Sequence, residues 1–335
     1  MSKILIICSQ SIDDLGLFND IKNDDDYIFR VAYEKEYTRK SIKSFVMTIL
    51  KKVHLNPIVN KVINLPGKYI WHSYYDVRKQ IKDIDTIIIM NGAVRFIDYD
   101  FLHYCKKHNS GVKVYLYFID SLQSQSPALV NSIDKIFKYN WDEIFTFDPV
   151  DAKENGFRYL GFSYFSISHK VNGHSPAAVS DLFFAGGLKG NREKLIIETY
   201  QYLTENGINS DFILSTYGKE LKSFPTGIDI SEGFRSYQDI LKRTLNSNCI
   251  LEILQEGQHG TSIRYFEAVC YNKKLLTNNP DIVNYPLYDE RYMKVFMSPQ
   301  DIDLQWIRSD MQPDYHYNNE FSPKNLKHRI TKLYE

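Results

Sequence analysis

The chain has 335 residues, of which 43% are hydrophobic and 24% charged, and its 41 basic and 41 acidic residues leave no formal net charge. This length favours two globular domains, and the balanced charge argues against nucleic acid as the main partner, since such binders usually carry a basic excess. No run approaches the roughly 18 apolar residues of a membrane span, and the amino terminus lacks the pattern of a signal peptide. We therefore expect a cytoplasmic protein, associated at most peripherally with the inner face of the membrane.

Short apolar runs alternate with helical patterns through the first half of the chain. The runs at 3–8, 85–93, 112–121 and 142–148 end in or lead into small polar or acidic residues, as a buried parallel strand does where it opens into a loop. The runs are residues 3–8, 27–33, 85–93, 112–121, 142–148 and 157–165. Helical patterns at 100–110 and 126–140 lie between them, the second with Ser126 as N-cap and Pro127 at the first helical position. This alternation predicts βαβ units and a doubly wound sheet.

A stretch of Gly, Pro and small polar residues at 171–180 interrupts the pattern and is interpreted as a linker. The alternation of strands and helices then restarts. The predicted strands are 181–187, 211–218, 249–255 and 273–279, and the predicted helices are 191–207, 236–248 and 262–271. The sequence thus predicts an α/β protein with two doubly wound, Rossmann-like domains at 1–170 and 181–310, followed by a tail with a last helix at 311–335. The carboxyl ends of both sheets are expected to face a cleft, where ligands bind in open α/β sheets.

A glycine-rich loop precedes the predicted helix at 262–271 and follows a predicted strand. Gly260 allows a close approach of the backbone to a ligand. Thr261 and Ser262 can cap the helix and offer hydroxyl and backbone N–H donors to an anion, which the positive end of the helix dipole also favours. The loop therefore predicts a phosphate-binding site.

Two charged residues inside this helix extend the prediction. Arg264 carries a permanent charge whose planar fork matches phosphate oxygens. Glu267, one turn further, is placed to accept hydrogen bonds from the two hydroxyls of a ribose, and we expect it to be exposed in the cleft. The alternative is a plain capped helix in which Arg264 pairs with Glu267 or Glu256, with both partners exposed.

A second basic, glycine-containing loop follows the strand at 181–187. It carries Gly187, Lys189 and Arg192. Alone, such a turn is usually a flexible loop with solvated charges. Because both loops fall at the carboxyl ends of strands in one domain, together they could hold a diphosphate from two sides.

The segments FFAGG, SYQDILKRTLNSNCILEILQEG and GTSIRYFEAVCYNKKLLTNN, in this order, resemble the donor domain of the GT-B fold glycosyltransferases. The likeness covers roughly residues 181–297 and is greatest to bacterial capsule and lipopolysaccharide transferases and to the CgeB-like group. It implies that Glu267 binds the ribose of a nucleotide-sugar and that the small residues before it face the diphosphate. The chain departs from the pattern at His259, where many of these enzymes carry another glutamate, and at Asn272, where a small residue is usual.

A transferase also needs an acid or base from the first domain. The candidates are Asp13 and Asp14 after the first strand and Asp120 after the strand at 112–121, although each can equally be a helix or turn cap. Asp120 is preferred, because an apolar strand delivers it to the sheet edge, where burial would raise its pKa. The acidic run Asp24–Asp26 is interpreted as a turn rather than a metal site, and the histidines lack zinc-binding spacing.

The resemblance implies a glycosyltransferase. The basic loops and the lack of a credible pair of aspartate ligands predict that it works without a metal ion or another cofactor. It would move a sugar from a nucleotide diphosphate to a glycan or lipid-linked glycan acceptor during bacterial surface polysaccharide assembly. Lys189, Arg192 and Arg264 would stabilise the leaving diphosphate in place of a metal. The alternatives are a nucleotide-sugar epimerase of the same fold and a non-catalytic nucleotide-sugar or glycan binder that supports a partner transferase. The sequence leaves open the donor sugar, the acceptor, the stereochemistry and the oligomeric state.

Overall fold

The structure is a computed structural model that describes most of the chain, in two compact units. The N-terminal unit comprises Met1–Ser166 together with Ser322–Glu335, and the C-terminal unit comprises Ile167–Phe321. The described residues are 3–33, 42–54, 56, 59, 67–97, 99–122, 137, 139–161, 164–167, 180–188, 192–216, 224–233, 235–255, 258–260 and 262–334.

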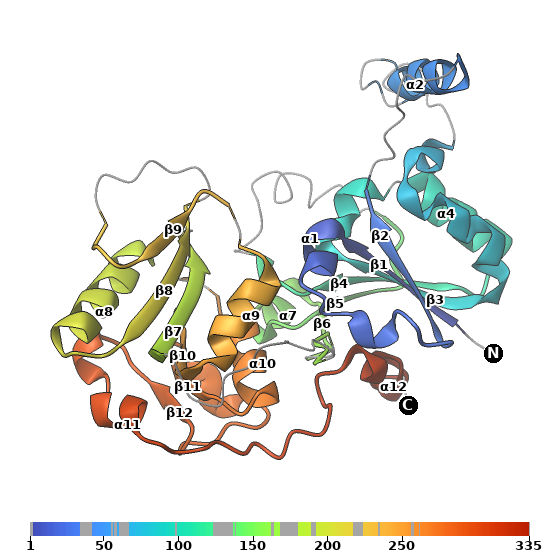
Figure 1. Cartoon of the computed structure of the whole chain (residues 1–335). Helices are drawn as coiled ribbons and strands as arrows, with labels where there is room; N and C mark the ends of the chain where they lie inside the picture. The colour runs from blue at the N-terminus through green and yellow to red at the C-terminus, as the bar shows by residue number, and fades with distance from the viewer. Residues whose placement is uncertain are drawn as a thin grey trace. The chain divides into compact units, whose positions relative to one another are not determined.

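The N-terminal unit is built on a six-stranded parallel sheet of order β2-β1-β3-β4-β5-β6 (Figure 1). Its strands are β1 (Lys3–Ser9), β2 (Tyr27–Ala32), β3 (Ile84–Met90), β4 (Lys113–Phe118), β5 (Glu143–Thr146) and β6 (Arg158–Tyr159). Its helices are α1 (Gln10–Asp14), α2 (Ile42–His54), α4 (Tyr99–His108), α7 (Pro149–Asn155) and α12 (Leu326–Lys332), with 3-10 helices at Asn19–Ile21, Lys68–Trp71, Ser73–Asp83, Asn91–Phe96 and Pro323–Asn325. The central strands are buried almost throughout because helices cover both faces of a doubly wound sheet.

The C-terminal unit has a second six-stranded parallel sheet, of order β12-β11-β10-β7-β8-β9. Its strands are β7 (Ser180–Gly187), β8 (Ser210–Ser215), β9 (Asp229–Ser231), β10 (Ser247–Glu252), β11 (Lys274–Thr277) and β12 (Met293–Val295). Its helices are α8 (Glu193–Glu205), α9 (Tyr237–Leu245), α10 (Ile263–Cys270) and α11 (Leu304–Arg308), with 3-10 helices at Pro280–Asn284 and Pro299–Asp301. The strand order is that of the dinucleotide-binding Rossmann fold, and it reverses direction between β7 and β10.

The predicted pair of doubly wound sheets is therefore confirmed. The predicted helix at 126–140 falls almost entirely outside the described residues, and so does the linker up to residue 179. Strands β9 and β12 are not in the sequence prediction, and each has only three residues. Among the described helices, none combines the length and apolar character that crossing a bilayer demands.

Local signals set several helix boundaries. Asp148 accepts hydrogen bonds from the backbone N–H groups of the first turn of α7, and Pro149 occupies its first position. Ser236 caps α9 in the same way by accepting from Asp239 N–H. Helix α8 closes where Gly207 adopts a positive φ of 70°, a conformation that costs glycine little.

The carboxyl-terminal tail packs on the N-terminal unit, from Ser322 onward. Lys324 lies 3.8 Å from the carboxylate of Asp24, and Lys327 lies 3.5 Å from that of Asp26. The acidic turn thus pairs with lysines of the tail. Within the part of the chain that the structure describes, no three acidic, His or Cys side chains form a group that could hold a metal ion.

Candidate functional site

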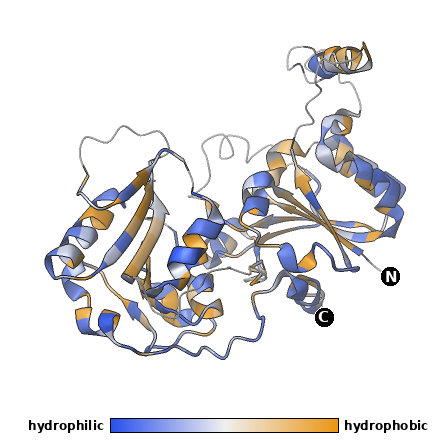
Figure 2. Ribbon diagram, in the orientation of Figure 1, coloured by the Kyte–Doolittle hydropathy of each residue, from blue (hydrophilic) through white to orange (hydrophobic). Residues whose placement is uncertain are grey.

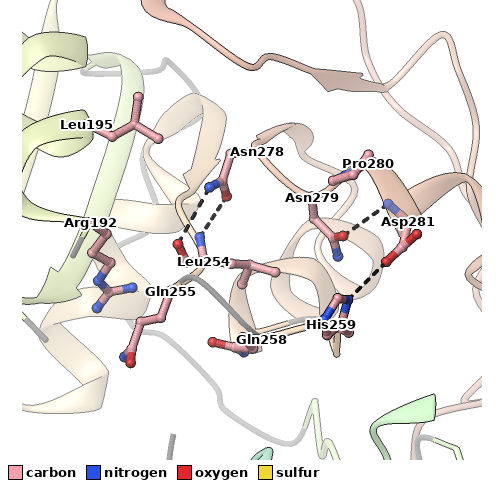
Figure 3. A pocket seen from close by; sticks show the side chains of 10 residues that line it. All are labelled: Arg192, Leu195, Leu254, Gln255, Gln258, His259, Asn278, Asn279, Pro280 and Asp281. Carbon is pink, nitrogen blue, oxygen red and sulfur yellow. Dashed lines mark hydrogen bonds and ion pairs between the residues drawn. The ribbon is translucent and has the colours of Figure 1, made fainter. Parts of the chain in front are cut away.

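A pocket of about 470 Å³ opens at the carboxyl edge of the C-terminal sheet (Figure 3). It is formed by the segments that follow three neighbouring strands, β7, β10 and β11. The lining residues are Arg192, Leu195, Leu254, Gln255, Gln258, His259, Asn278, Asn279, Pro280 and Asp281. Because the strand order reverses between β7 and β10, the loops that follow these two strands diverge and leave a crevice, the usual ligand site of open α/β sheets.

Arg192 stands at the start of α8 and connects two strand ends beneath the pocket. Its Nε and Nη2 donate to the carbonyl oxygen of Gly187 at 2.9 and 2.5 Å, and its Nη1 donates to that of Ile253 at 2.7 Å. The guanidinium therefore holds the ends of β7 and β10 together. At the same time, it brings a permanent positive charge to the pocket wall.

Two asparagines after β11 order the opposite wall. Asn278 accepts a hydrogen bond from Leu254 N–H at 2.7 Å, which ties the β10 and β11 loops together. The Oδ1 of Asn279 accepts from Asp281 N–H at 3.0 Å and caps the 3-10 helix that follows. Its Nδ2 is buried and has no hydrogen-bond partner among the described residues. The pocket wall therefore contains an amide donor with unused capacity.

The pocket rim carries a histidine–aspartate pair, His259 and Asp281, whose Nδ1 and Oδ2 atoms lie 3.5 Å apart (Figure 3). Both side chains are about half exposed. The hydroxyl of Tyr285 donates to the backbone carbonyl of His259 at 2.5 Å and fixes this part of the loop. His259 thus lines the pocket. It occupies the sequence position at which many of the GT-B transferases that the chain resembles carry a glutamate.

The structure places Arg264 and Glu267 differently from the sequence prediction. Their side chains form an ion pair and are 7% and 0% exposed, and neither lines the pocket. Burial raises the pKa of Glu267, while the charge of Arg264 and the hydroxyls of Tyr237 and Thr244 lower it. The expected exposure of both residues is therefore wrong. Both side chains are buried because α10 packs with nearly its whole surface covered by protein, rather than with one face only.

The amino-terminal end of α10 is also occupied by protein groups. Glu252, at the end of β10, accepts from Ser262 N–H at 2.8 Å and from the hydroxyl of Thr277 at 2.7 Å. The hydroxyl of Ser262 in turn accepts from Arg264 N–H at 3.1 Å. Burial raises the pKa of Glu252. A carboxylate at this point competes with phosphate for the N–H donors on which the sequence prediction relied.

The remaining predicted ligand residues fall into two groups. Gly187 offers its carbonyl to Arg192, and Gly260 is buried and accepts from Gln258 Nε2 at 3.3 Å. Lys189 and Thr261 lie outside the described residues. Among the residues of the predicted set that the structure describes, only Arg192 lines the pocket. The pocket side chains of the β10 and β11 loops were not predicted, although their position directly after apolar strands was a usable signal.

The candidate acid/base residues lie after β1 and β4 in the N-terminal unit. Asp13 pairs with Lys22 at 2.5 Å, and Asp14 accepts from Gln10 Nε2 at 2.8 Å, so both stabilise local structure. Asp120 is exposed beyond the end of β4. The expected burial of Asp120 is therefore wrong: Asp120 is exposed although its neighbours Ile119 and Ser121 are buried.

No known family model and no curated protein matches this chain. Among solved structures, an α-glucosyltransferase in complex with UDP-glucose and DNA containing an abasic site aligns with a TM-score of 0.50 and 12% identity over 99% of this chain and 89% of that chain. The lipopolysaccharide outer core galactosyltransferase WaaB aligns with a TM-score of 0.49 and 11% identity over 99% of both chains. S. aureus TarM, in complex with UDP among other ligands, aligns with a TM-score of 0.49 and 12% identity over 78% of this chain and 58% of TarM. This chain therefore spans less than two thirds of the length of TarM.

The α-glucosyltransferase alignment concerns the fold alone at this level of identity. It agrees with the two parallel six-stranded sheets and with the Rossmann strand order of the C-terminal unit. The chain has the fold of the GT-B glycosyltransferases.

Proposed function

We propose that the chain is a glycosyltransferase that binds a nucleotide-diphosphate sugar in the pocket of the C-terminal unit. The observation that carries this proposal is the position of the pocket at the point where a Rossmann-type strand order reverses. The solved α-glucosyltransferase of similar fold holds UDP-glucose, which supports a UDP-sugar as the first donor to test.

The chemistry of the pocket supports a ligand of this kind. Its volume of about 470 Å³ is within the usual range for small-molecule sites. Leu195 and Leu254 offer apolar surface to a base or sugar ring, while Gln258 can bind hydroxyl or phosphate oxygens. We propose that Arg192 provides the positive charge nearest to the diphosphate.

The proposed transfer is independent of metal ions. Arg192 and the neighbouring Lys189 would offset the charge of the leaving diphosphate, whereas Arg264 is already paired with Glu267. Activity should therefore survive EDTA. A complete loss on chelation, restored by magnesium or manganese, would contradict this part of the proposal.

We further propose a glycan or lipid-linked glycan of a bacterial surface polysaccharide as the acceptor, on the strength of the sequence resemblance. Asp120 is the proposed base that takes the proton of the acceptor hydroxyl. Asp120→Asn keeps the shape of the side chain but removes its basicity, and turnover should fall by about 100-fold or more with donor binding nearly unchanged. Normal turnover in this variant would exclude Asp120 as the base.

A second candidate function is non-catalytic binding of a nucleotide-sugar or glycan in support of a partner transferase. The side-chain contacts of Asp13 and Asp14 favour it, because they leave fewer groups available for proton transfer. Slow hydrolysis of the bound nucleotide-sugar would favour the transferase. Tight binding without transfer or hydrolysis, for every acceptor fraction tested, would favour the binder.

The deciding experiment measures the affinity of the protein for UDP-, GDP-, dTDP- and CMP-sugars by calorimetry, with two matched variants. Gln258→Trp fills the pocket, and Gln201→Trp makes the same change on the exposed side of α8. We expect one nucleotide-sugar to bind, a loss of at least tenfold for Gln258→Trp and no change for Gln201→Trp. Equal binding by both variants would place the ligand elsewhere.

A further inference from the structure

Helix α2 of the N-terminal unit presents its apolar side to solvent. Six apolar residues recur at helical spacing along it, and each is between 46% and 86% exposed. They are Ile42, Phe45, Val46, Ile49, Leu50 and Val53. The polar positions Ser44, Thr48 and Lys51 are partly buried instead. This is the reverse of an ordinary surface helix, whose apolar stripe faces the core.

The six residues form a continuous stripe, which we call the α2 stripe. They account for six of the fifteen large apolar side chains that are exposed in the described part of the chain. Apolar residues scattered singly over a surface need no explanation, but a contiguous patch indicates a partner. Figure 2 shows apolar residues on α2 beside hydrophilic ones.

The charge around the α2 stripe indicates the nature of that partner. Between Arg39 and Lys61 the sequence has six lysine or arginine residues and no acidic residue, although the whole chain carries equal numbers of each. Lys51 and Lys52 lie in the last turn of α2 itself. A partner that covers the stripe must therefore be apolar and negatively charged.

We propose that α2 lies flat on an anionic lipid surface, with the α2 stripe at the boundary between headgroups and acyl chains and the exposed Lys52 at the lipid phosphates. A basic amphipathic helix with aliphatic and Phe residues on one face is suited to this position. At 13 residues, α2 is about 20 Å long and cannot cross an apolar core of about 30 Å. A second copy of the chain fits less well, because two basic helices without acidic residues repel each other.

The test is co-sedimentation of the full chain with vesicles. Vesicles of phosphatidylcholine alone are compared with vesicles that contain one third phosphatidylglycerol. Ile49→Gln with Leu50→Gln removes the centre of the α2 stripe, and Ser44→Gln with Thr48→Gln places the same side chains on the opposite side of α2. Lys51→Gln with Lys52→Gln removes two charges and keeps the stripe. Equal melting temperatures would show that the variants are folded.

We expect binding to the anionic vesicles only, reduced at least tenfold by the stripe variant and unchanged by the Ser44 and Thr48 control. The lysine variant should bind more weakly by about fivefold per charge, and salt should weaken the wild type in the same way. Absence of binding to anionic vesicles, or equal binding by the stripe variant, would overturn the proposal. So would a lipid-free dimer that the stripe variant abolishes, because the stripe would then belong to a protein interface. None of these measurements involves nucleotide-sugar binding, so the outcome is independent of the proposed transferase function.

Discussion

Arg264 and Glu267 form an ion pair inside the C-terminal unit, one turn apart on α10. Both side chains are almost inaccessible to water, and the hydroxyls of Tyr237 and Thr244 contribute to the same polar cluster. In a buried ion pair, the attraction between the two charges offsets the free-energy cost of removing them from water. If one partner is lost, the remaining buried charge has no such compensation and the fold is destabilised. The pair is therefore a point where the C-terminal unit is sensitive to substitution.

We predict that Glu267→Ala destabilises the protein strongly. The substitution leaves the Arg264 guanidinium buried without its partner, and the loss of unfolding free energy should be about 3–5 kcal/mol. Denaturant unfolding followed by circular dichroism measures it. The control is Glu198→Ala, which breaks an exposed pair with Lys194 on α8 and should cost less than about 1 kcal/mol.

The double variant Arg264→Met with Glu267→Leu should recover much of this loss, since it removes both buried charges and keeps the volume. A stable Glu267→Ala variant that no longer binds nucleotide-sugar would contradict the prediction. It would mean that Glu267 reaches the ligand, as the sequence resemblance implies.

The sequence predicts the two sheets well because their strands are long apolar runs. β1, β3 and β4 contain six or seven residues each, enough for the pattern to stand out. β9 has only three residues, and a run this short carries no periodic signal. The structure adds it because it pairs with β8 across the sheet, a contact that the local sequence does not encode.

The candidate site is predicted less well, because burial depends on what packs against an element. The spacing of Arg264 and Glu267 fits an exposed ligand pair and a buried ion pair equally, and only the surrounding β10 and α9 decide between them. Glu252 illustrates the same limit, since a carboxylate within an apolar strand has no defined role until Ser262 and Thr277 are placed beside it. The position of a residue directly after a predicted strand was a more reliable signal for the pocket than the spacing of charged residues within a helix.

We predict that Asp281→Asn strengthens the binding of nucleoside diphosphates. Among the described side chains that line the pocket, Asp281 is the acidic one, and its charge repels a diphosphate. Removing it should raise affinity several-fold at low salt and less at high salt. Asp314→Asn is the control, because it changes a similar His–Asp pair, with His316, away from the pocket. If both variants raised the affinity equally, the cause would be the change in the overall charge of the protein. The assignment of the pocket as the diphosphate site would then lose its support.

We predict that Asp142 stabilises the N-terminal unit at neutral pH and not in acid. Partial burial acts to raise its pKa, but the hydrogen bonds from Lys106 and Val114 N–H and the charge of Lys113 hold the pKa below its ordinary value. A carboxyl with a lowered folded pKa contributes stability above its unfolded pKa of about 3.9 and loses it as the pH falls through the folded value.

Asp142→Asn should therefore lower the unfolding free energy by about 1–2 kcal/mol at pH 7. This difference from the wild type should shrink as the pH falls below about 4. Chemical denaturation at several pH values measures both effects. Asp85→Asn, at an exposed position of β3, should leave the profile unchanged. A difference that persists at pH 2 would show that Asp142 acts through packing rather than through its charge.

The last prediction concerns the buried thiols. Burial raises the pKa of Cys8, Cys105 and Cys249 to about 12, while Cys270 is partly exposed. Because the thiolate is the reactive form, we predict that Ellman's reagent at pH 8 modifies no more than one thiol of the native protein and four after unfolding.

The same thiols should make the fold sensitive to alkali. A thiol with a raised folded pKa keeps its proton in the native state, while the unfolded chain releases it above about pH 8.5, so stability falls as the pH rises between that value and about 12. Each thiol should contribute a loss of about 1.4 kcal/mol per pH unit in this range. Cys249→Ala should remove one such contribution. Equal slopes for the wild type and Cys249→Ala, measured by denaturant unfolding at pH 9, 10 and 11, would show that Cys249 does not titrate on unfolding.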